Sequence, residues 1–440
     1  MKQWWFLLLA MLFISEATVP FLRWPIGMPK ATMVLTEGIS ALVAALTFAF
    51  MLTKDRIPKG MLVILGITLV WGIVAFFEGQ SLAMFLWGWW RLFLYPLVGL
   101  FTYLVIGDPK GFAGWFIKFC MGFLAFEVVV QIIMYLLGFP PGDDLAGTFG
   151  WHGVNPFTMM AFFVACMGLG HWMVTNQLKY MLLALSLGAI ASVLNVTKFY
   201  FFAIVPLSLT AFVLNVGQSG RLRKLIVFVS LSLLGVIVIV PMLDAQLAIK
   251  DNTTLQDYLD PDMVMRYIMT TKINTNDATY IGRGYAPIYS WERLQRDTTT
   301  MLFGYGLGSR SSSDALGLVG AGFRNDVFGT FYDINSTTLG NWMLEYGLVG
   351  IGLFLGMIIW IDMQLFRYLK TKPEPDKAAI AYGLILFTSF WPVWIWYHNV
   401  WSAQIMKALY WISLGYILRQ AFAPPPRPAS SRVRLPHENR

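Results

Sequence analysis

The chain contains 440 residues, of which 57% are hydrophobic and 13% are charged. An ordinary soluble domain carries about 25% charged residues, so this composition excludes that class and favours a membrane protein. The net charge of +8 does not indicate a nucleic-acid partner, because excess Lys and Arg usually fix the orientation of a membrane protein. The two cysteines, Cys120 and Cys166, offer neither a disulfide framework nor a metal-ligand spacing.

Apolar runs of roughly 17 or more residues recur along most of the chain, and each is long enough to cross a bilayer as a helix. They predict an all-α polytopic membrane protein with about 12 transmembrane helices. We place these spans at residues 3–19, 32–53, 60–77, 83–106, 112–138, 156–175, 180–196, 198–216, 224–242, 346–366, 378–397 and 401–418. The first run contains Glu16, and no small-residue cleavage site follows it, so we expect a retained span and not a signal peptide.

Positive charges are distributed unevenly over the loops between these spans. If the N-terminus lies in the cytoplasm, the cytoplasmic loops and the C-terminal tail carry most of the Lys and Arg residues. The short outer loops then carry only Arg23, Lys30 and Lys198. Cytoplasmic loops of membrane proteins are enriched in these residues, so we expect a multi-pass protein with both termini in the cytoplasm.

Loop lengths divide the chain into four parts. Residues 1–242 hold spans one to nine, residues 243–345 form a large outer loop, residues 346–418 hold the last three spans, and residues 419–440 form a basic cytoplasmic tail predicted to be disordered. Within the large loop, apolar residues at helical spacing predict two interfacial helices, at 253–272 and 286–302. A loop of this length with its own structure is usually functional.

Several ionisable side chains fall inside or at the ends of the predicted spans. These are Arg91, Glu127, Lys198 and Lys407. Charged groups are costly in a bilayer, so each is a functional candidate. The alternative is a structural ion pair or a side chain that reaches the interface, and we favour it for Glu127 and Lys407. Arg91 lies deep in its span beside several tryptophans, which predicts an aromatic-lined pocket open to the outside.

The large loop is rich in arginine. It carries Arg266, Arg283, Arg293, Arg296, Arg310 and Arg324. Guanidinium groups bind phosphate oxygens in a fork, so several arginines facing a membrane pocket would suit a diphosphate. Ordinary solvation is the alternative, and we favour it for Arg293 and Arg296. The Gly-rich segment GYGLGS at 304–309 is interpreted as a plain loop.

Four segments, taken in order, resemble the bacterial O-antigen ligase and O-antigen polymerase superfamily. They are GTFGWHGVN at 147–155, NVTKFYFFAIVPL at 195–207, RGYAPIYSWERL at 283–294 followed by LFGYGLGS at 302–309, and NSTTLGNWMLEYGLVG at 335–350. Arg283 and Trp291 have the family's spacing before the Gly-rich turn, and Leu339, Glu345 and Gly347 fit the last motif. The large loop before the last three spans also matches the family's plan.

Two positions depart from the family pattern. Where ligases carry a His proposed as the catalytic base, this chain has Asn335 or Ser336, and where the family usually has Arg, it has Lys198. The base is then sought among other residues, namely Asp333, Asp326, Glu345, His152 and His398. The missing His favours the polymerase side of the superfamily.

The resemblance implies a membrane glycosyltransferase with a GT-C-like fold in the bacterial inner membrane. It would polymerise undecaprenyl-diphosphate-linked oligosaccharide repeat units on the periplasmic face, without a metal or other cofactor. Expected partners are that lipid-linked substrate, membrane lipids, a flippase and a chain-length regulator, and not nucleic acid. The resemblance assigns the diphosphate or glycan to Lys198, Arg283, Arg91, Arg310 and Arg324, and the catalytic role to Asp333, Asn335, Glu345 and His152.

Three alternatives stay open. A ligase of the same superfamily would transfer the glycan to a lipid core or a protein. A secondary transporter fits twelve spans with buried charges, although no corresponding pair of Gly- or Pro-broken helices is evident in two halves. A non-catalytic assembly protein descended from the enzymes would explain the missing His.

Overall fold

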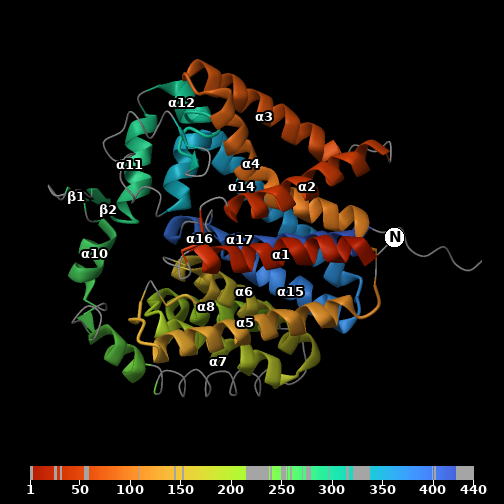
Figure 1. The fold of residues 1–440 in the computed structure, drawn as a ribbon, viewed down its shortest axis with the longest axis vertical. Helices are drawn as coiled ribbons and strands as arrows, with labels where there is room; N and C mark the ends of the chain where they lie inside the picture. The colour runs from red at the N-terminus through yellow and green to blue at the C-terminus, as the bar shows by residue number, and fades with distance from the viewer. Residues whose placement is uncertain are drawn as a thin grey trace, which may run out of the picture.

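The fold is described from a computed structural model of the chain. It describes residues 3–23, 27–29, 32–53, 59–107, 109–142, 145–150, 153–214, 237, 240–248, 254, 256–257, 260–269, 271–273, 279–295, 297–313, 317–320, 337–398, 400 and 403–422. Regular structure in these ranges is almost entirely helical (Figure 1). The apolar composition predicts this outcome, because a helix satisfies its own backbone hydrogen bonds without water.

The first half of the chain forms eight labelled helices and one short 3-10 turn. Their bounds are α1 Gln3–Arg23, α2 Met33–Thr53, α3 Lys59–Phe77, α4 Leu82–Val105, α5 Phe112–Leu136, η2 Gly147–Phe149, α6 Val154–Thr175, α7 Leu178–Leu194 and α8 Lys198–Leu214. The hydroxyl of Ser81 caps α4 by accepting a hydrogen bond from the Met84 amide at 3.3 Å. Most of these helices coincide with predicted spans within a few residues.

The core of the bundle lies around α6, which is buried along nearly its whole length. Gly170 allows this helix to approach α15 closely, because a Cβ at this position would overlap the Ala379 carbonyl and lie 2.7 Å from the Gly383 amide nitrogen. Small residues at helix interfaces permit such backbone contact in membranes. The contact fixes α6 and α15 as the central pair.

The region predicted as a large outer loop contains short helices and two hairpins. The elements are α10 Pro261–Met269, β1 Thr271–Ile273, β2 Thr279–Ile281, α11 Tyr285–Leu294, α12 Thr298–Phe303, β3 Ser312–Ser313 and β4 Leu318–Val319. Both hairpins are antiparallel, with Lys272 opposite Tyr280 in the first. The helix expected at 286–302 is two helices, because Asp297 accepts a hydrogen bond from the Thr300 amide and starts a new one.

Four helices form the C-terminal part. They are α14 Thr338–Lys370, α15 Pro375–Ser389, α16 Trp391–Tyr397 and α17 Gln404–Phe422. The helix that contains the predicted tenth span, α14, begins earlier, at Thr338, and it bends at Gly347, beside the predicted start of the span. The predicted eleventh span is bent by 45° between α15 and α16. The predicted disordered tail also starts too early, because α17 continues to Phe422.

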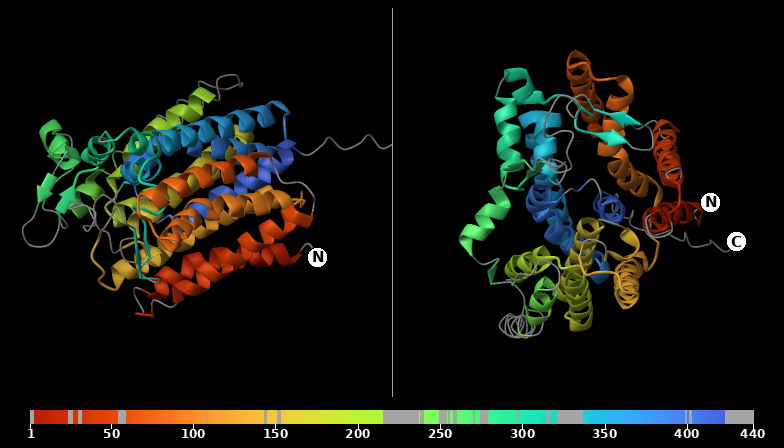
Figure 2. Two further views of the ribbon diagram at one scale, coloured as in Figure 1. Left: turned by 90° about the horizontal axis from the view of Figure 1, so that it is seen from above. Right: turned by 60° about the vertical axis from the view of Figure 1, so that its left-hand side comes forward.

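Five described helices are long and apolar enough to cross a membrane: α2, α4, α5, α6 and α14. The bent pair of α15 and α16 would make a sixth. The protein is therefore an all-α, membrane-embedded chain, and the number of twelve spans stays a prediction. The predicted ninth span, 224–242, lies largely outside the described residues. The start of α1 and the end of α17 lie at one end of the bundle (Figure 2). α10, β1 and β2 lie at the opposite end, which we call the loop end.

Candidate functional site

The ring of Tyr397, at the end of α16, contacts one predicted diphosphate cation and the sequence neighbour of another. The guanidinium carbon of Arg283 lies 4.1 Å from the ring centre. Phe199, which follows Lys198 in the first turn of α8, stacks on the same ring with 4.4 Å between centroids. Both groups lie over the ring plane, so they occupy opposite faces. Tyr397 thereby connects the first turn of α8 with the residue pair before α11.

A tight turn sets the position of Lys198. Val196 has a left-handed backbone (φ 56°), which a β-branched residue adopts only under constraint. The Thr197 amide donates to the Ser192 carbonyl at 2.8 Å and to Oδ1 of Asn195 at 3.2 Å. These bonds close the turn between α7 and α8, and they place the half-buried Lys198 at the positive end of the α8 dipole.

His398 follows Tyr397 and lies in an aromatic enclosure. Its ring stacks on Trp394 with 5.2 Å between centroids and meets Phe199 and Tyr397 edge-on. Only 1% of the residue is exposed, and neither ring nitrogen has a hydrogen-bond partner among the described residues. Burial, and then the charge of Arg283, hold the pKa of His398 well below its ordinary value. The imidazole is therefore neutral at physiological pH.

The start of α14 is fastened to this enclosure. The Thr338 amide and hydroxyl both donate to the His398 carbonyl at 3.0 Å, and the Thr338 hydroxyl accepts from the Val400 amide at 2.7 Å. Thr338 is thus used as a link between α14 and the segment after α16. Thr338 belongs to the polar start of the motif at 335–350, which the sequence predicts to form part of the active site.

Glu345 lies deeper in α14 and is engaged by the Gly-rich turn. Its Oε1 accepts from the Arg310 amide at 3.0 Å and from the Ser311 hydroxyl at 2.9 Å, and the carboxylate is buried. Arg91 is its nearest opposite charge. A carboxylate with two donors and a cation is held in place, and this geometry favours a structural role over that of a free base.

The Gly-rich turn at 304–309 is a packing element. Gly304, Gly306 and Gly308 all have φ between 70° and 87°, a region that favours glycine. A Cβ on Gly306 would lie 2.6 Å from Ala75 on α3, and one on Gly304 would lie 2.5 Å from the backbone of Glu345. The turn therefore lies directly against α3 and α14, and the Trp71 indole donates to the Phe303 carbonyl at 3.1 Å.

A cavity of about 520 Å³ lies between α4, α14 and α17. Its walls are mostly apolar and aromatic, and Arg91 and Lys407 contribute the cations. Trp342 and Val400 line the part nearest to His398. The aromatic pocket predicted around Arg91 thus corresponds to a cavity between helices.

Carboxylates of other helices interact with Arg91 and Lys407, the two cations of the cavity. The Tyr95 hydroxyl donates to Glu16 at 2.9 Å, and the Lys407 ammonium lies 4.5 Å from the centre of the Tyr95 ring. The Trp90 indole donates to Glu37 at 2.6 Å. Arg91 and Lys407 both interact electrostatically with Glu37. This arrangement is consistent with the structural ion pair that the sequence favours for Lys407.

Glu127 has a local structural partner in the smaller loop. Its carboxylate accepts from the amide and the hydroxyl of Thr148, and the neighbouring Gln131 donates to the Leu145 carbonyl at 2.7 Å. These bonds fasten η2 to α5. They account for a buried carboxylate in this helix without a transport role.

The structure brings the predicted residues together in two groups. Arg283 and Phe199, the residue after Lys198, contact the ring of Tyr397. Glu345 accepts from the Arg310 amide and interacts electrostatically with Arg91. The remaining predicted site residues, His152, Arg324, Asp333 and Asn335, lie outside the described residues, as does Asp326. The aromatic enclosure of His398 is the feature that the motifs missed, although the run WPVWIWYH at 391–398 signals it.

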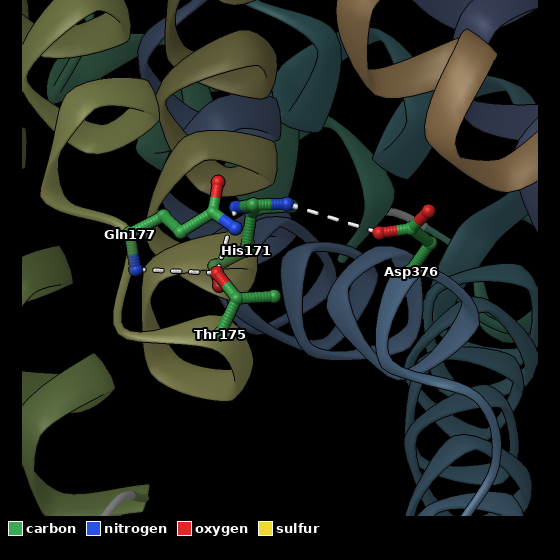
Figure 3. A network of polar contacts seen from close by, with 4 residues as sticks. All are labelled: His171, Thr175, Gln177 and Asp376. Atoms are coloured by element: carbon green, nitrogen blue, oxygen red, sulfur yellow. Dashed lines mark hydrogen bonds and ion pairs between the residues drawn. The ribbon is translucent and has the colours of Figure 1, made fainter.

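A second polar cluster lies at the opposite end of α6 (Figure 3). Nε2 of His171 lies 3.8 Å from Oδ1 of Asp376, in the first turn of α15, and its Nδ1 lies 3.1 Å from the Thr175 hydroxyl. The Gln177 amide donates to the same hydroxyl at 3.2 Å. This cluster connects the end of α6 to the start of α15. It lies at the end of α6 that is remote from His398.

Comparison with known proteins adds no relative. No family model matches the chain, and no curated protein matches it. The resemblance to the O-antigen ligase and polymerase superfamily therefore rests on the four motifs and on the position of their residues.

Proposed function

We propose that the protein is a membrane glycosyltransferase of the bacterial inner membrane. It polymerises undecaprenyl-diphosphate-linked repeat units on the periplasmic face, and its helical fold is GT-C-like. The observation that carries the proposal is that Arg283 and Phe199, the residue after Lys198, both contact the ring of Tyr397. These residues come from two separate motifs, and they converge at the loop end of the bundle.

The chemistry needs a site for a developing negative charge. When the acceptor oxygen attacks the anomeric carbon, the bond from that carbon to the diphosphate oxygen breaks, and its electron pair stays on the diphosphate. Fixed cations and helix N-termini stabilise such charge without reorganisation. Lys198 supplies a point charge at the start of α8, and Arg283 supplies a planar fork held against Tyr397.

The cavity between α4, α14 and α17 suits the apolar chain of the donor. Its walls are apolar over most of their area, and it extends from Val400, near His398, to Ile361 within α14. Arg91 is assigned to this cavity, with its charge balanced in part by Glu345. Arg310 is buried, and its amide serves the Glu345 clamp. Arg324 remains a sequence-based assignment to the diphosphate.

Alanine substitutions test the diphosphate site in cells. We expect Lys198→Ala and Arg283→Ala each to lower polymer yield by about 100-fold or more at normal protein levels, since each removes charge stabilisation of the leaving group. Arg293→Ala is the matched control, because Arg293 lies on α11 against Tyr289. Full-length polymer from both Lys198→Ala and Arg283→Ala would contradict the assignment.

Two assays separate the alternatives. Lipid-linked repeat units supplied alone support chain growth by a polymerase, whereas a ligase needs an added lipid core or protein acceptor. Ion-driven uptake in liposomes that is lost in Glu127→Gln would favour a transporter. We expect no such uptake, because Glu127 is engaged by Thr148.

A further inference from the structure

Three residues near Tyr397 carry buried polar atoms that have no hydrogen-bond partner among the described residues. They are the Thr337 hydroxyl, the Trp394 indole nitrogen and both ring nitrogens of His398. None of them has a hydrogen-bond partner among the described residues, and the three residues are at most 1% exposed. A buried polar atom left unsatisfied costs about 1–3 kcal/mol, so a concentration of them indicates a place that a ligand completes.

Contacts between elements connect the three residues that carry these atoms. Trp394 stacks on the His398 ring, and Thr337 immediately precedes Thr338, which hydrogen-bonds to the His398 carbonyl. The cavity described above reaches Val400, two residues beyond His398, and Trp391, three residues before Trp394. The His398 ring therefore lies within the influence of Arg283, and residues close to it in sequence line the cavity.

The chemical character of the group narrows the ligand. The indole nitrogen only donates, the hydroxyl donates and accepts, and a neutral imidazole offers one donor and one acceptor. Such a mixed set suits a sugar ring, whose hydroxyls also do both. An anion binds best where all the neighbouring groups are hydrogen-bond donors. It therefore fits Lys198 and Arg283 better than this mixed set of donors and acceptors.

We infer that Thr337, Trp394 and His398 form the subsite for the acceptor sugar, and that His398 takes the proton from its attacking hydroxyl. The inference rests on the proposed function. The acceptor O–H bond breaks and its proton moves to a ring nitrogen, while the oxygen bonds to the anomeric carbon of the donor. The diphosphate leaves with the electron pair of the broken bond, and the imidazolium later releases its proton to water.

The groups around His398 are suited to this role. Arg283, which lies just before α11, is the charged group that acts on the His398 ring. Phe199, which follows Lys198, meets the ring edge-on, and the start of α14 is hydrogen-bonded to the His398 carbonyl. Burial of the ring and the charge of Arg283 disfavour a positive imidazole in the resting state, so the ring stays neutral and able to accept a proton. The negative charge on the leaving diphosphate would compensate the imidazolium when it forms.

The test uses purified full-length protein with a lipid-linked repeat unit as both donor and acceptor. We expect His398→Phe, which keeps the ring contact with Trp394, to lower kcat by about 100-fold or more with little change in KM, as for loss of a general base. His171→Gln is the matched control, since it removes a histidine at the other end of α6. Thermal unfolding of each variant checks folding.

A second variant separates proton transfer from packing. In His398→Ala, added imidazoles should restore turnover, and the restored rate should increase with the pKa of the imidazole used. A structural role would make rescue depend on the size of the imidazole alone, and this result would overturn the inference. Near-normal kcat in folded His398→Phe would also overturn it while leaving the Lys198 and Arg283 results intact. No transfer by the wild-type protein would instead refute the proposed function, and the inference with it.

Discussion

At the scale of single residues, the role that a sequence motif predicts for a side chain differs at some positions from the role that its contacts in the structure support. Arg283 and Phe199, the residue after Lys198, come from separate motifs, and their common contact with Tyr397 depends on the path of α16, which the motifs do not contain. Glu345 was a predicted base, yet its carboxylate is occupied by the Arg310 amide and the Ser311 hydroxyl. His398 was one of several candidate bases, and its burial becomes visible only when α8 and α16 pack together.

Substitution of Glu345 separates a clamp from a base. Glu345→Ala leaves the Arg310 amide and the Ser311 hydroxyl without their acceptor and Arg91 without its nearest carboxylate, so we expect a loss of about 3–5 kcal/mol in stability. Glu345→Gln keeps an acceptor and should lose less. The unfolding temperature in detergent measures both. A Glu345→Gln protein of wild-type stability that lacks all transferase activity would instead favour a catalytic role.

The pH dependence of turnover belongs to His398. Its lowered pKa keeps the imidazole neutral, so wild-type kcat should persist below pH 6.5 and fall only as the pH drops through that lowered pKa. The rate of His398→Phe should lack this acidic limb. If the rates of both proteins fell over the same acidic pH range, a group other than His398 would control the pH dependence.

At the scale of elements, hydrophobic periodicity predicts the helices and misses their interruptions. The apolar runs place α4, α5 and α6 within a few residues, because a buried helical span needs little else. The start of α14 was missed since its polar first turns read as loop, although Thr338 and Glu345 use that polarity for contacts. The two hairpins escaped prediction because their strands have only two or three residues.

The Gly-rich turn offers a test of packing between elements. Gly306→Ala places a Cβ 2.6 Å from Ala75 at a φ of 87°, and we expect it to destabilise the protein by about 1–3 kcal/mol. Gly38→Ala is the matched control, because nothing lies within 4 Å of its added Cβ. The unfolding temperatures of the two variants compare these outcomes directly. Equal temperatures would show that the turn does not pack against α3 as described.

At the scale of the whole molecule, a bundle around α6 and α15 carries short helices and hairpins at its loop end (Figure 2). Composition predicts the class of the molecule, since the low charged fraction requires an apolar environment. It does not predict the cavity between α4, α14 and α17, which depends on the bend at Gly347 and on how three distant segments pack. Residues close in sequence to His398 line that cavity.

Chain growth in reconstituted liposomes tests the central claim most directly. The purified protein is supplied with undecaprenyl-diphosphate-linked repeat units and no other acceptor, and the products are resolved by length. We predict a ladder of polymers from the wild-type protein and from Arg293→Ala, and none from Lys198→Ala or Arg283→Ala. The absence of any ladder with the wild-type protein, or an undiminished ladder with both alanine variants, would contradict the account.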